Sequence, residues 1–183
     1  YGRSGLDVKV AGTDLVINNQ PVKFFSEKEP AKLPWGQLGV DVVIESTGVF
    51  ETYEKAKFHL DAGARKVVVS APIKGTPTAG ISGGMVIMGI NDQLLDKCQI
   101  TSNASCTTNA AAPVIQILHE TIGIEKAMLN TIHAYTATQK LVDSPDAKDF
   151  RRGRAGAQNI VPSTTGAAVA VTEIVTDLKG KFD

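Results

Sequence analysis

The sequence lacks an excess of charge of either sign, and it lacks a long apolar run. Its 183 residues carry 19 lysines and arginines against 19 aspartates and glutamates, so the net charge is zero. A nucleic-acid binder or a polybasic membrane binder shows a basic excess or stripe, and we expect neither kind of partner. No apolar run approaches the ~18 residues that span a bilayer. Apolar residues nevertheless make up 43% of the chain, which predicts a folded globular protein rather than a disordered one.

Cysteine is scarce, and so are the signals that direct a chain out of the cell. Only Cys98 and Cys106 are present, and two cysteines cannot build the disulfide framework of a small secreted domain. The first dozen residues mix charges with glycines and begin without methionine, so no signal peptide is expected. These absences predict a cytoplasmic enzyme-type chain, and one that is incomplete.

Short apolar runs separated by a helical segment predict an α/β fold. Residues 40–44 and 66–70 have the composition of buried parallel strands. Between them, residues 53–62 suit a helix that stops at Gly63. Strand, helix and strand in this order predict a parallel crossover with right-handed connection.

The rest of the chain is expected to contain further strands, two helices and one long loop. The loop, residues 140–154, is charged and irregular, which in a compact domain usually indicates function. A change of character near Cys106 is the one candidate domain boundary. The other expected elements are a hairpin of strands 14–17 and 22–25 turning at Asn18-Asn19, strands 86–90, 99–102 and 125–137, and helices 107–121 and 165–178.

Cys106 is the leading candidate for chemistry, because it follows a predicted strand and opens a predicted helix. A thiol at a helix N-terminus faces unpaired N–H groups and the positive end of the dipole, and both favour the thiolate. The alternative is a small buried hydrophobic residue, which is the commonest role of a free cysteine. Cys98 has no such context and is expected to be structural.

His133 is the candidate partner of that thiol, in a segment predicted to be a strand. An imidazole beside a thiol can pair with the thiolate and later carry its proton. Taken alone, a strand histidine is more often a hydrogen-bonded core residue. His59 and His119 are expected on helix surfaces without a partner, and three histidines this scattered predict no metal site.

A basic cluster formed by Arg151, Arg152 and Arg154 has two interpretations. Guanidinium groups recognise phosphate oxygens well, so the cluster could bind a phosphate group. It equally suits a solvated loop in which nearby aspartates balance the charge of the arginines. The hydroxyl-rich run 163–166 precedes a predicted helix, where it either holds an anion or simply caps the helix. Thiol, imidazole, arginine and hydroxyls together suggest covalent acyl chemistry on a small anionic substrate.

Longer strings of residues resemble one family, the phosphorylating glyceraldehyde-3-phosphate dehydrogenases. Residues 102–109 read SNASCTTN and residues 133–139 read HAYTATQ, and both strings resemble the family's catalytic motifs. Shorter strings follow in the same order: PWG at 34–36, ESTGVF at 45–50, SAP at 70–72, QNIVP at 158–162 and TGAA at 165–168. The resemblance covers essentially the whole chain.

The resemblance implies a partial Rossmann-type NAD-binding domain over residues 1–105, followed by part of an α+β catalytic domain over residues 106–183. It implies NAD as cofactor, glyceraldehyde 3-phosphate and inorganic phosphate as substrates, and a homotetramer when full length. No Gly-x-Gly-x-x-Gly string is present. We therefore expect the family's first βαβ unit and its C-terminal part to be missing, and the chain alone to be an incomplete enzyme.

Residue roles carry over from the family position by position. Cys106 would attack the aldehyde carbon and pass through a thiohemiacetal to a thioester, with His133 as base. The positions that match phosphate contacts are Thr136 and Arg152 for the substrate, and Ser105, Thr107, Thr165 and Gly166 for the attacking phosphate. The positions that match cofactor contacts are Lys28, Thr47, Ser70 and Pro145.

Some residues depart from the family pattern, and other functions stay open. Lys28 stands where members often have arginine, and Ala110 replaces a second cysteine. Pro145 resembles the residue of the NAD-preferring members.

One alternative function is that of an erythrose-4-phosphate dehydrogenase. Others are a non-catalytic assembly module that keeps the sheet without the cofactor, and a thiol redox sensor at Cys106.

Overall fold

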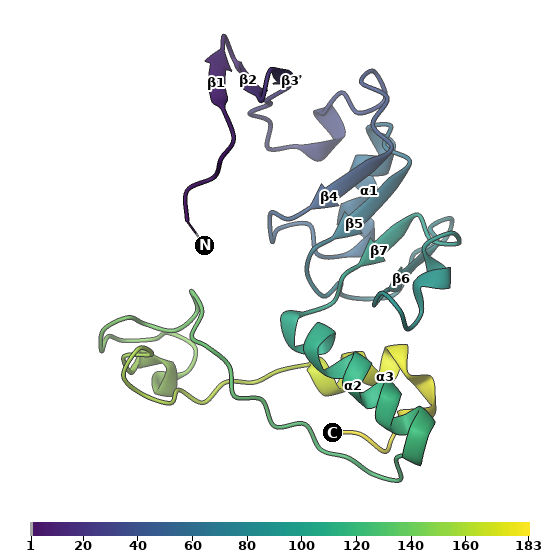
Figure 1. Ribbon diagram of the computed structural model, residues 1–183, viewed down its shortest axis with the longest axis vertical. Coiled ribbons are helices and arrows are strands. Elements are labelled where there is room, and N and C mark those ends of the chain that lie inside the picture. The colour runs from purple at the N-terminus through teal and green to yellow at the C-terminus, as the bar shows by residue number, and fades with distance from the viewer. Residues whose placement is uncertain (1) are drawn as a thin grey trace.

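A four-stranded parallel sheet forms the centre of the molecule in the computed structural model, which describes residues 2–183 (Figure 1). Its strands lie in the order β4, β5, β7, β6. The last strand in sequence, β7, therefore lies between β5 and β6, and β6 is at the edge of the sheet. They are β4 (Val42–Glu45), β5 (Lys66–Val69), β6 (Gly83–Met85) and β7 (Ile100–Ser102). All three pairings are parallel, which confirms the predicted α/β class.

Helix α1 (Tyr53–Asp61) connects β4 to β5 and packs against the sheet. Thr52 caps it, because its hydroxyl accepts a 3.2 Å hydrogen bond from the Lys55 N–H. The predicted strand, helix and strand are therefore present, with boundaries displaced by one or two residues. The apolar side chains between helix and sheet are those of Tyr53, Ala56, Val67, Val69, Ile81 and Ile100.

The N-terminal residues form an antiparallel three-stranded sheet at the top of Figure 1. Its strands are β1 (Val8–Ala11), β2 (Asp14–Ile17) and β3 (Gln20–Val22). Asn18 and Asn19 turn the second hairpin with φ values of 48° and 64°. Asparagine tolerates this left-handed conformation, which tight two-residue hairpins require. The predicted hairpin is confirmed, although its second strand starts two residues earlier than expected.

The C-terminal half is built on α2 (Cys106–Ile122), which packs against α3 (Ala167–Ile174). Both helices were predicted, but the second is shorter than expected and is followed by a separate 3₁₀ turn. The core here is formed by Ile87, Ala104, Ala112, Val171, Ile174, Val175, Leu178 and Phe182. The 3₁₀ turns of the chain are η1 (Pro30–Lys32), η2 (Asp92–Leu94), η3 (Phe150–Gly153) and η4 (Thr176–Leu178).

Two predicted strands are wrong. Residues 86–90 lie just after β6, and the chain turns there through a hydrogen bond from the Ile90 N–H to the Ile87 carbonyl. Residues 125–137 are irregular, with one isolated bridge between Ala127 and Phe182. A strand exists through hydrogen bonds to a neighbouring strand. Here the backbone of Ala127 and Leu129 bonds to residues 181–183 at the C-terminal end, and no ladder continues through the rest of residues 125–137 in the described structure.

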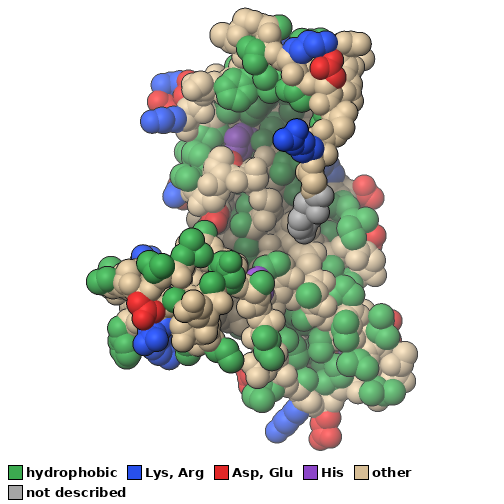
Figure 2. Space-filling view, turned by 60° about the vertical axis from the view of Figure 1, so that its left-hand side comes forward, with side chains coloured by type: hydrophobic (Ala, Val, Ile, Leu, Met, Phe, Trp, Pro, Cys, Tyr) green, Lys and Arg blue, Asp and Glu red, His purple; other side chains and the backbone are tan. Residues whose placement is uncertain are grey.

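The irregular C-terminal segments leave many apolar side chains at the surface. Figure 2 shows hydrophobic side chains spread over much of one face of the molecule, with few charges between them. Ile132 and Ile160 are both 99% exposed. Met128, Ile132 and Tyr135, which suggested the strand, are all exposed, whereas Ala127 and Leu129 at the start of the same segment pack against the core. Within residues 2–183, no helix combines the length and the apolar character needed to cross a membrane.

Candidate active site

Cys106 sits where β7 gives way to α2, at the carboxyl edge of the parallel sheet. The Asn103 N–H donates to the Val69 carbonyl (2.9 Å), which holds the end of β7 beside the end of β5. Ser105 then caps α2, since its hydroxyl accepts a 3.0 Å bond from the Thr108 N–H. Cys106 is the first residue of the helix and is exposed, as the predicted nucleophile position requires.

His133 reaches the thiol from the irregular segment that follows α2. Its Nε2 lies 3.3 Å from the Cys106 Sγ, and its Nδ1 lies 2.6 Å from the Ala134 carbonyl oxygen. A carbonyl can only accept, so Nδ1 carries a proton and donates it. Nε2 is then free either to accept the thiol proton or, once protonated, to donate to the thiolate.

The electrostatics of this pair favour charge separation. The hydrogen bond from His133, supported by the backbone and hydroxyl of Thr107, holds the pKa of the Cys106 thiol below its usual range despite some burial. The Ala134 carbonyl, followed by the nearby sulfur, raises the pKa of His133. Both shifts widen the pH range in which thiolate and imidazolium coexist.

Cys98 lies in a different environment. It is 7% exposed, and its sulfur lies close to Gly84 at the edge of the sheet. The prediction that it is a structural residue agrees with this burial. It provides an internal reference for any experiment on Cys106.

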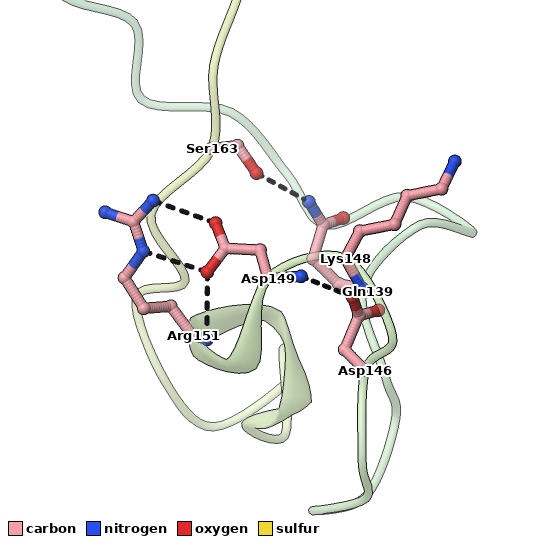
Figure 3. Close-up of polar contacts among 6 residues, drawn as sticks. All are labelled: Gln139, Asp146, Lys148, Asp149, Arg151 and Ser163. Carbon is pink, nitrogen blue, oxygen red and sulfur yellow. Dashed lines mark hydrogen bonds and ion pairs between the residues drawn. The ribbon is translucent and has the colours of Figure 1, made fainter.

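Gln139 ties together two segments that carry predicted phosphate contacts. Its side-chain oxygen accepts bonds from the Thr136 N–H (2.6 Å) and hydroxyl (3.0 Å). Its side-chain amide donates to the Ser163 hydroxyl at 3.3 Å (Figure 3). Ser163 is two residues before Thr165, so the turn at Thr136 and the start of α3 are held near each other.

The arginine cluster is divided between two environments. Arg151 donates two bonds to the Asp149 carboxylate, at 3.0 and 2.8 Å (Figure 3), and Arg154 lies 3.4 Å from Asp143. These two arginines form ion pairs with aspartates of their own loop. Arg152 differs, because its Nε is buried and has no hydrogen-bond partner within residues 2–183. A buried, unpaired guanidinium N–H is a group that an anion would satisfy.

The hydroxyls near the two helix starts already have local partners. The Thr165 hydroxyl accepts from the Ala167 N–H at 3.1 Å, and Gly166 occupies the cap position of α3 without a side-chain hydrogen bond. Ser105 holds Thr108, and Thr107 lies against the thiol. Of the predicted phosphate contacts, Ser105 and Thr107 flank Cys106 in the chain, whereas no hydrogen bond joins Arg152 to this pair in the described residues.

The predicted cofactor residues Thr47 and Ser70 lie at the same sheet edge as Cys106. Glu45 pairs with Val69, and Val69 pairs with Ser102. The residues that follow these strands therefore emerge side by side, at the edge where doubly wound sheets bind nucleotides.

Both hydroxyl-bearing residues are exposed there, so they fit contacts with the part of a dinucleotide that lies at this edge. Lys28 and Pro145 are exposed in loops. No hydrogen bond or ion pair in residues 2–183 connects either of them to the edge.

The prediction that His59 lies on a helix surface without a partner is wrong. His59 is buried, its Nε2 lies 3.0 Å from the Glu45 carboxylate, and its Nδ1 accepts from the Trp35 indole at 3.1 Å. Alternation along β4 was the missed signal, because Glu45 shares the buried side of the strand with Val43. A buried carboxylate needs a donor, and α1 supplies it. No cluster of three metal-ligating side chains occurs in the described part of the chain.

Comparison with known proteins gives two family matches, one to each of two domains of the same enzyme. Residues 1–53 match the NAD binding domain of glyceraldehyde 3-phosphate dehydrogenase, and residues 105–183 match its C-terminal domain. Glyceraldehyde-3-phosphate dehydrogenase B of Aspergillus oryzae is 49% identical over 181 residues, which cover 99% of this chain and 52% of that protein.

Two further relatives are similar to the same extent. The glyceraldehyde-3-phosphate dehydrogenase of Phaeosphaeria nodorum is 49% identical over 183 residues, covering 100% of this chain and 52% of the relative. Glyceraldehyde-3-phosphate dehydrogenase 1 of Kluyveromyces lactis is 49% identical over 182 residues, covering 100% and 53%. The chain thus spans about half the length of the curated relatives it matches. Both domain matches and this identity along the whole chain establish that it belongs to the glyceraldehyde-3-phosphate dehydrogenase family.

Proposed function

We propose that this chain carries the reactive thiol of a glycolytic, NAD-dependent oxidation that converts glyceraldehyde 3-phosphate to 1,3-bisphosphoglycerate. The observation that carries the proposal is the 3.3 Å separation between the Cys106 Sγ and the His133 Nε2 at the first turn of α2. A nucleophile within hydrogen-bond reach of a base, with a third group orienting the base, is the geometry of covalent catalysis. The Ala134 carbonyl is that third group.

The reaction would begin when the Cys106 thiolate attacks the aldehyde carbon. A carbon–sulfur bond forms, and the carbonyl electron pair moves onto oxygen. The His133 imidazolium and the backbone N–H of Cys106 would stabilise this oxyanion. Proton transfer from His133 then gives the neutral thiohemiacetal on Cys106.

Oxidation requires the loss of one proton and one hydride from that thiohemiacetal. His133 would take the hydroxyl proton, and the hydride would leave the same carbon, producing a thioester on Cys106. NAD bound at the carboxyl edge of the sheet would supply the hydride acceptor. Thr47 and Ser70 are the residues at that edge that we propose to contact it, with Lys28 and Pro145 as more distant contacts.

Inorganic phosphate would complete the turnover. Its oxygen attacks the thioester carbon, the carbon–sulfur bond breaks, and the acyl phosphate leaves with Cys106 restored as thiolate. We propose Ser105, Thr107, Thr165 and Gly166 as the residues around the attacking phosphate. Thr136 and Arg152 would hold the substrate's own phosphate, and the unpaired Nε of Arg152 supports that role.

The proposal divides the chain at the residue before the nucleophile. Residues 1–105 would belong to the NAD-binding domain and residues 106–183 to the catalytic domain. The change from a strand-rich to a helical architecture at Cys106 supports this boundary (Figure 1). We also propose a cytoplasmic location and assembly of the whole protein as a homotetramer, for which the exposed apolar residues of the C-terminal half give physical support.

The test follows NAD reduction by absorbance after the full-length protein that contains this chain is mixed with NAD and glyceraldehyde 3-phosphate. Without phosphate we expect at most one NAD reduced per Cys106, because the thioester remains on the enzyme. Adding phosphate should then release the acyl group and allow further reduction. The Cys106→Ser variant is the control and should give neither phase.

Other results would favour the alternative functions. Faster reduction with erythrose 4-phosphate would favour the four-carbon aldehyde as substrate. A non-catalytic assembly module predicts no reduction with either sugar, together with a Cys106 that reacts with alkylating agents no faster than an ordinary thiol. That pair of results would contradict the proposed function.

A further inference from the structure

Ser102, the last residue of β7, makes more hydrogen bonds than any surface hydroxyl of the site. It is 1% exposed. Its hydroxyl donates to the Ala71 carbonyl (2.7 Å) and accepts from the N–H groups of Ala104 (3.1 Å) and Ile73 (3.3 Å). A serine hydroxyl has one proton and two lone pairs, so its bonding capacity is completely used.

The turn that this hydroxyl holds is strained. Ala104 has a φ of +55° and is 3% exposed. The left-handed conformation is unfavourable for a non-glycine residue, and such residues persist where the surrounding structure fixes them. The Ala104 methyl cannot swing outward to relieve the strain, because it is part of the apolar core between α2 and α3.

The neighbouring bonds fix the same turn from its other side. The Asn109 side-chain amide donates to the carbonyls of Asn103 (2.7 Å) and Ser105 (2.9 Å). Residues 103–105 are therefore held by Ser102, which precedes them, and by Asn109 in the first turn of α2, which follows them. Its conformation decides the direction in which α2 starts, and hence where the Cys106 sulfur lies relative to His133.

We infer that Ser102 is a positioning residue that orients the Cys106 thiol by fixing the left-handed turn at Ala104 and anchoring it to the loop after β5. That loop begins with Ser70, so the same hydroxyl joins the nucleophile to the edge proposed for the cofactor. This inference rests on the proposed function only for the identity of the reaction. The orientation of the thiol can be measured without substrate or cofactor.

The experiment measures the rate of iodoacetamide alkylation at Cys106 against pH in the full chain. Ser102→Ala removes the acceptor of the Ala104 N–H, so the turn should relax and Cys106 should lose its alignment with His133. We expect the midpoint of the alkylation curve to rise by about one pH unit, which lowers the rate about tenfold at pH values below both midpoints. Buried Cys98 reports unfolding, since it becomes reactive if the variant loses its fold.

A second substitution separates positioning from general destabilisation. Glycine adopts the left-handed conformation without penalty, so Ser102→Ala/Ala104→Gly should recover most of the lost rate. Thr172→Ala is the matched control. It removes a hydroxyl whose bond to the Val169 carbonyl stays within α3, and we expect less than a twofold change at Cys106.

The outcomes distinguish the inference from the proposed function. A low Cys106 midpoint in the parent chain with no change in Ser102→Ala would overturn the inference alone. A slow Ser102→Ala variant that Ala104→Gly does not rescue would overturn it as well, because the hydroxyl would then act by another route. A parent chain whose Cys106 titrates as an ordinary thiol would contradict the proposed function and leave no oriented thiol for Ser102 to hold.

Discussion

The indole Nε1–H of Trp35 donates to the Nδ1 of His59 across 3.1 Å, and this bond decides which nitrogen of the imidazole carries the proton. Indole is only a donor, so Nδ1 must accept and Nε2 must carry the hydrogen. Nε2 then donates to the Glu45 carboxylate at 3.0 Å. Glu45 in turn accepts from the N–H and hydroxyl of Thr47. A buried chain of bonds therefore runs from Trp35 to the loop after β4.

Replacing the histidine in the middle of this chain should be costly. His59→Ala leaves the buried Glu45 carboxylate without one donor and the Trp35 N–H without an acceptor. Removing one partner of a buried pair typically costs about 3–5 kcal/mol. We expect a loss of that size in the free energy of unfolding, measured by urea denaturation with circular dichroism.

Two further variants test the origin of that loss. His59→Gln offers a carbonyl to Trp35 and an amide to Glu45, so it should recover a large part of the stability. Lys57→Ala is the control, because Lys57 lies on the same helix in a partly exposed ion pair with Asp61 and its loss should change stability by less than about 1 kcal/mol. Equal losses for His59→Ala and Lys57→Ala would contradict the importance of the hydrogen bonds from Trp35 through His59 to Glu45.

Glu45 gives this chain of bonds a defined pH dependence. Burial alone would raise the pKa of Glu45, but the hydrogen bonds from Thr47 and His59 outweigh it and hold the pKa below its ordinary value. A carboxylate with a lowered folded pKa stabilises the fold above its unfolded pKa of about 4.3. That contribution is lost as the pH falls from there through the folded pKa.

The comparison with Glu45→Gln isolates this contribution from those of the other acidic residues. The glutamine does not titrate, so the stability difference between parent and variant should shrink as the pH is lowered through the carboxylate region. The measurement is the urea midpoint of both proteins at a series of pH values from about 6 to about 3. A difference that stays constant across the series would show that Glu45 does not titrate differently in the folded state.

The thiol–imidazole pair predicts a second pH profile. His133→Asn removes the cation that lowers the pKa of Cys106, so the alkylation midpoint should move up toward the ordinary value of about 8.5. At a pH below both midpoints the rate should fall, because each unit by which the pKa rises reduces the thiolate fraction about tenfold there.

Two controls accompany this measurement. His119→Asn changes a histidine on the opposite end of α2 and should leave the profile of Cys106 intact. Cys98 should stay slow in every variant that remains folded. If His133→Asn alkylates with the parent profile, the 3.3 Å contact does not activate the thiol.

The sequence predicted the elements that rely on local chemistry. Asn18 and Asn19 identified a hairpin because few residues other than glycine accept left-handed backbone. Cys106 was placed at a helix start because it follows a predicted strand and precedes the predicted helix 107–121, and in the structure Ser105 caps that helix. The contact between Cys106 and His133 was also anticipated from the sequence, from the local setting of each residue and from the resemblance of the strings around them to one family.

The features that the sequence did not predict depend on distant partners. Residues 125–137 contain strand-forming side chains, yet strands require a hydrogen-bonded neighbour, and a neighbour cannot be deduced from composition. His59 has a helix-surface pattern, and its burial follows from Glu45 on β4 and Trp35 in a loop, both far away in the chain. Ser102 is similar, since its partners Ala71 and Ile73 lie about thirty residues earlier.

The position of Trp35 depends on a close approach between two glycines. Gly63 ends the α1 segment with a φ of +104°, and a Cβ placed there would lie 2.5 Å from the Gly36 Cα. The Gly36 N–H also donates to the Ala62 carbonyl at 3.0 Å. These contacts fix the loop that carries Trp35 against the end of the helix that carries His59.

Gly63→Ala should therefore destabilise the protein and disturb the indole. The added methyl meets backbone, which cannot swing aside as a side chain can, and overpacking of this kind costs about 1–3 kcal/mol beyond the backbone strain. Gly75→Ala is the matched control, because Gly75 also has a positive φ (81°) but has open space around it. It should lose only the roughly 1–2 kcal/mol of left-handed strain.

The difference between the two glycine variants measures the steric part alone. Urea unfolding gives the stability of each, and the emission maximum of Trp35 reports the bond to His59. We expect Gly63→Ala to lose more stability and to shift the emission, and Gly75→Ala to leave the emission unchanged. Equal losses with unshifted emission would contradict this role of the glycine contact. They would mean that the backbone at Gly36 and Gly63 can move apart without loss of the hydrogen bond between Trp35 and His59.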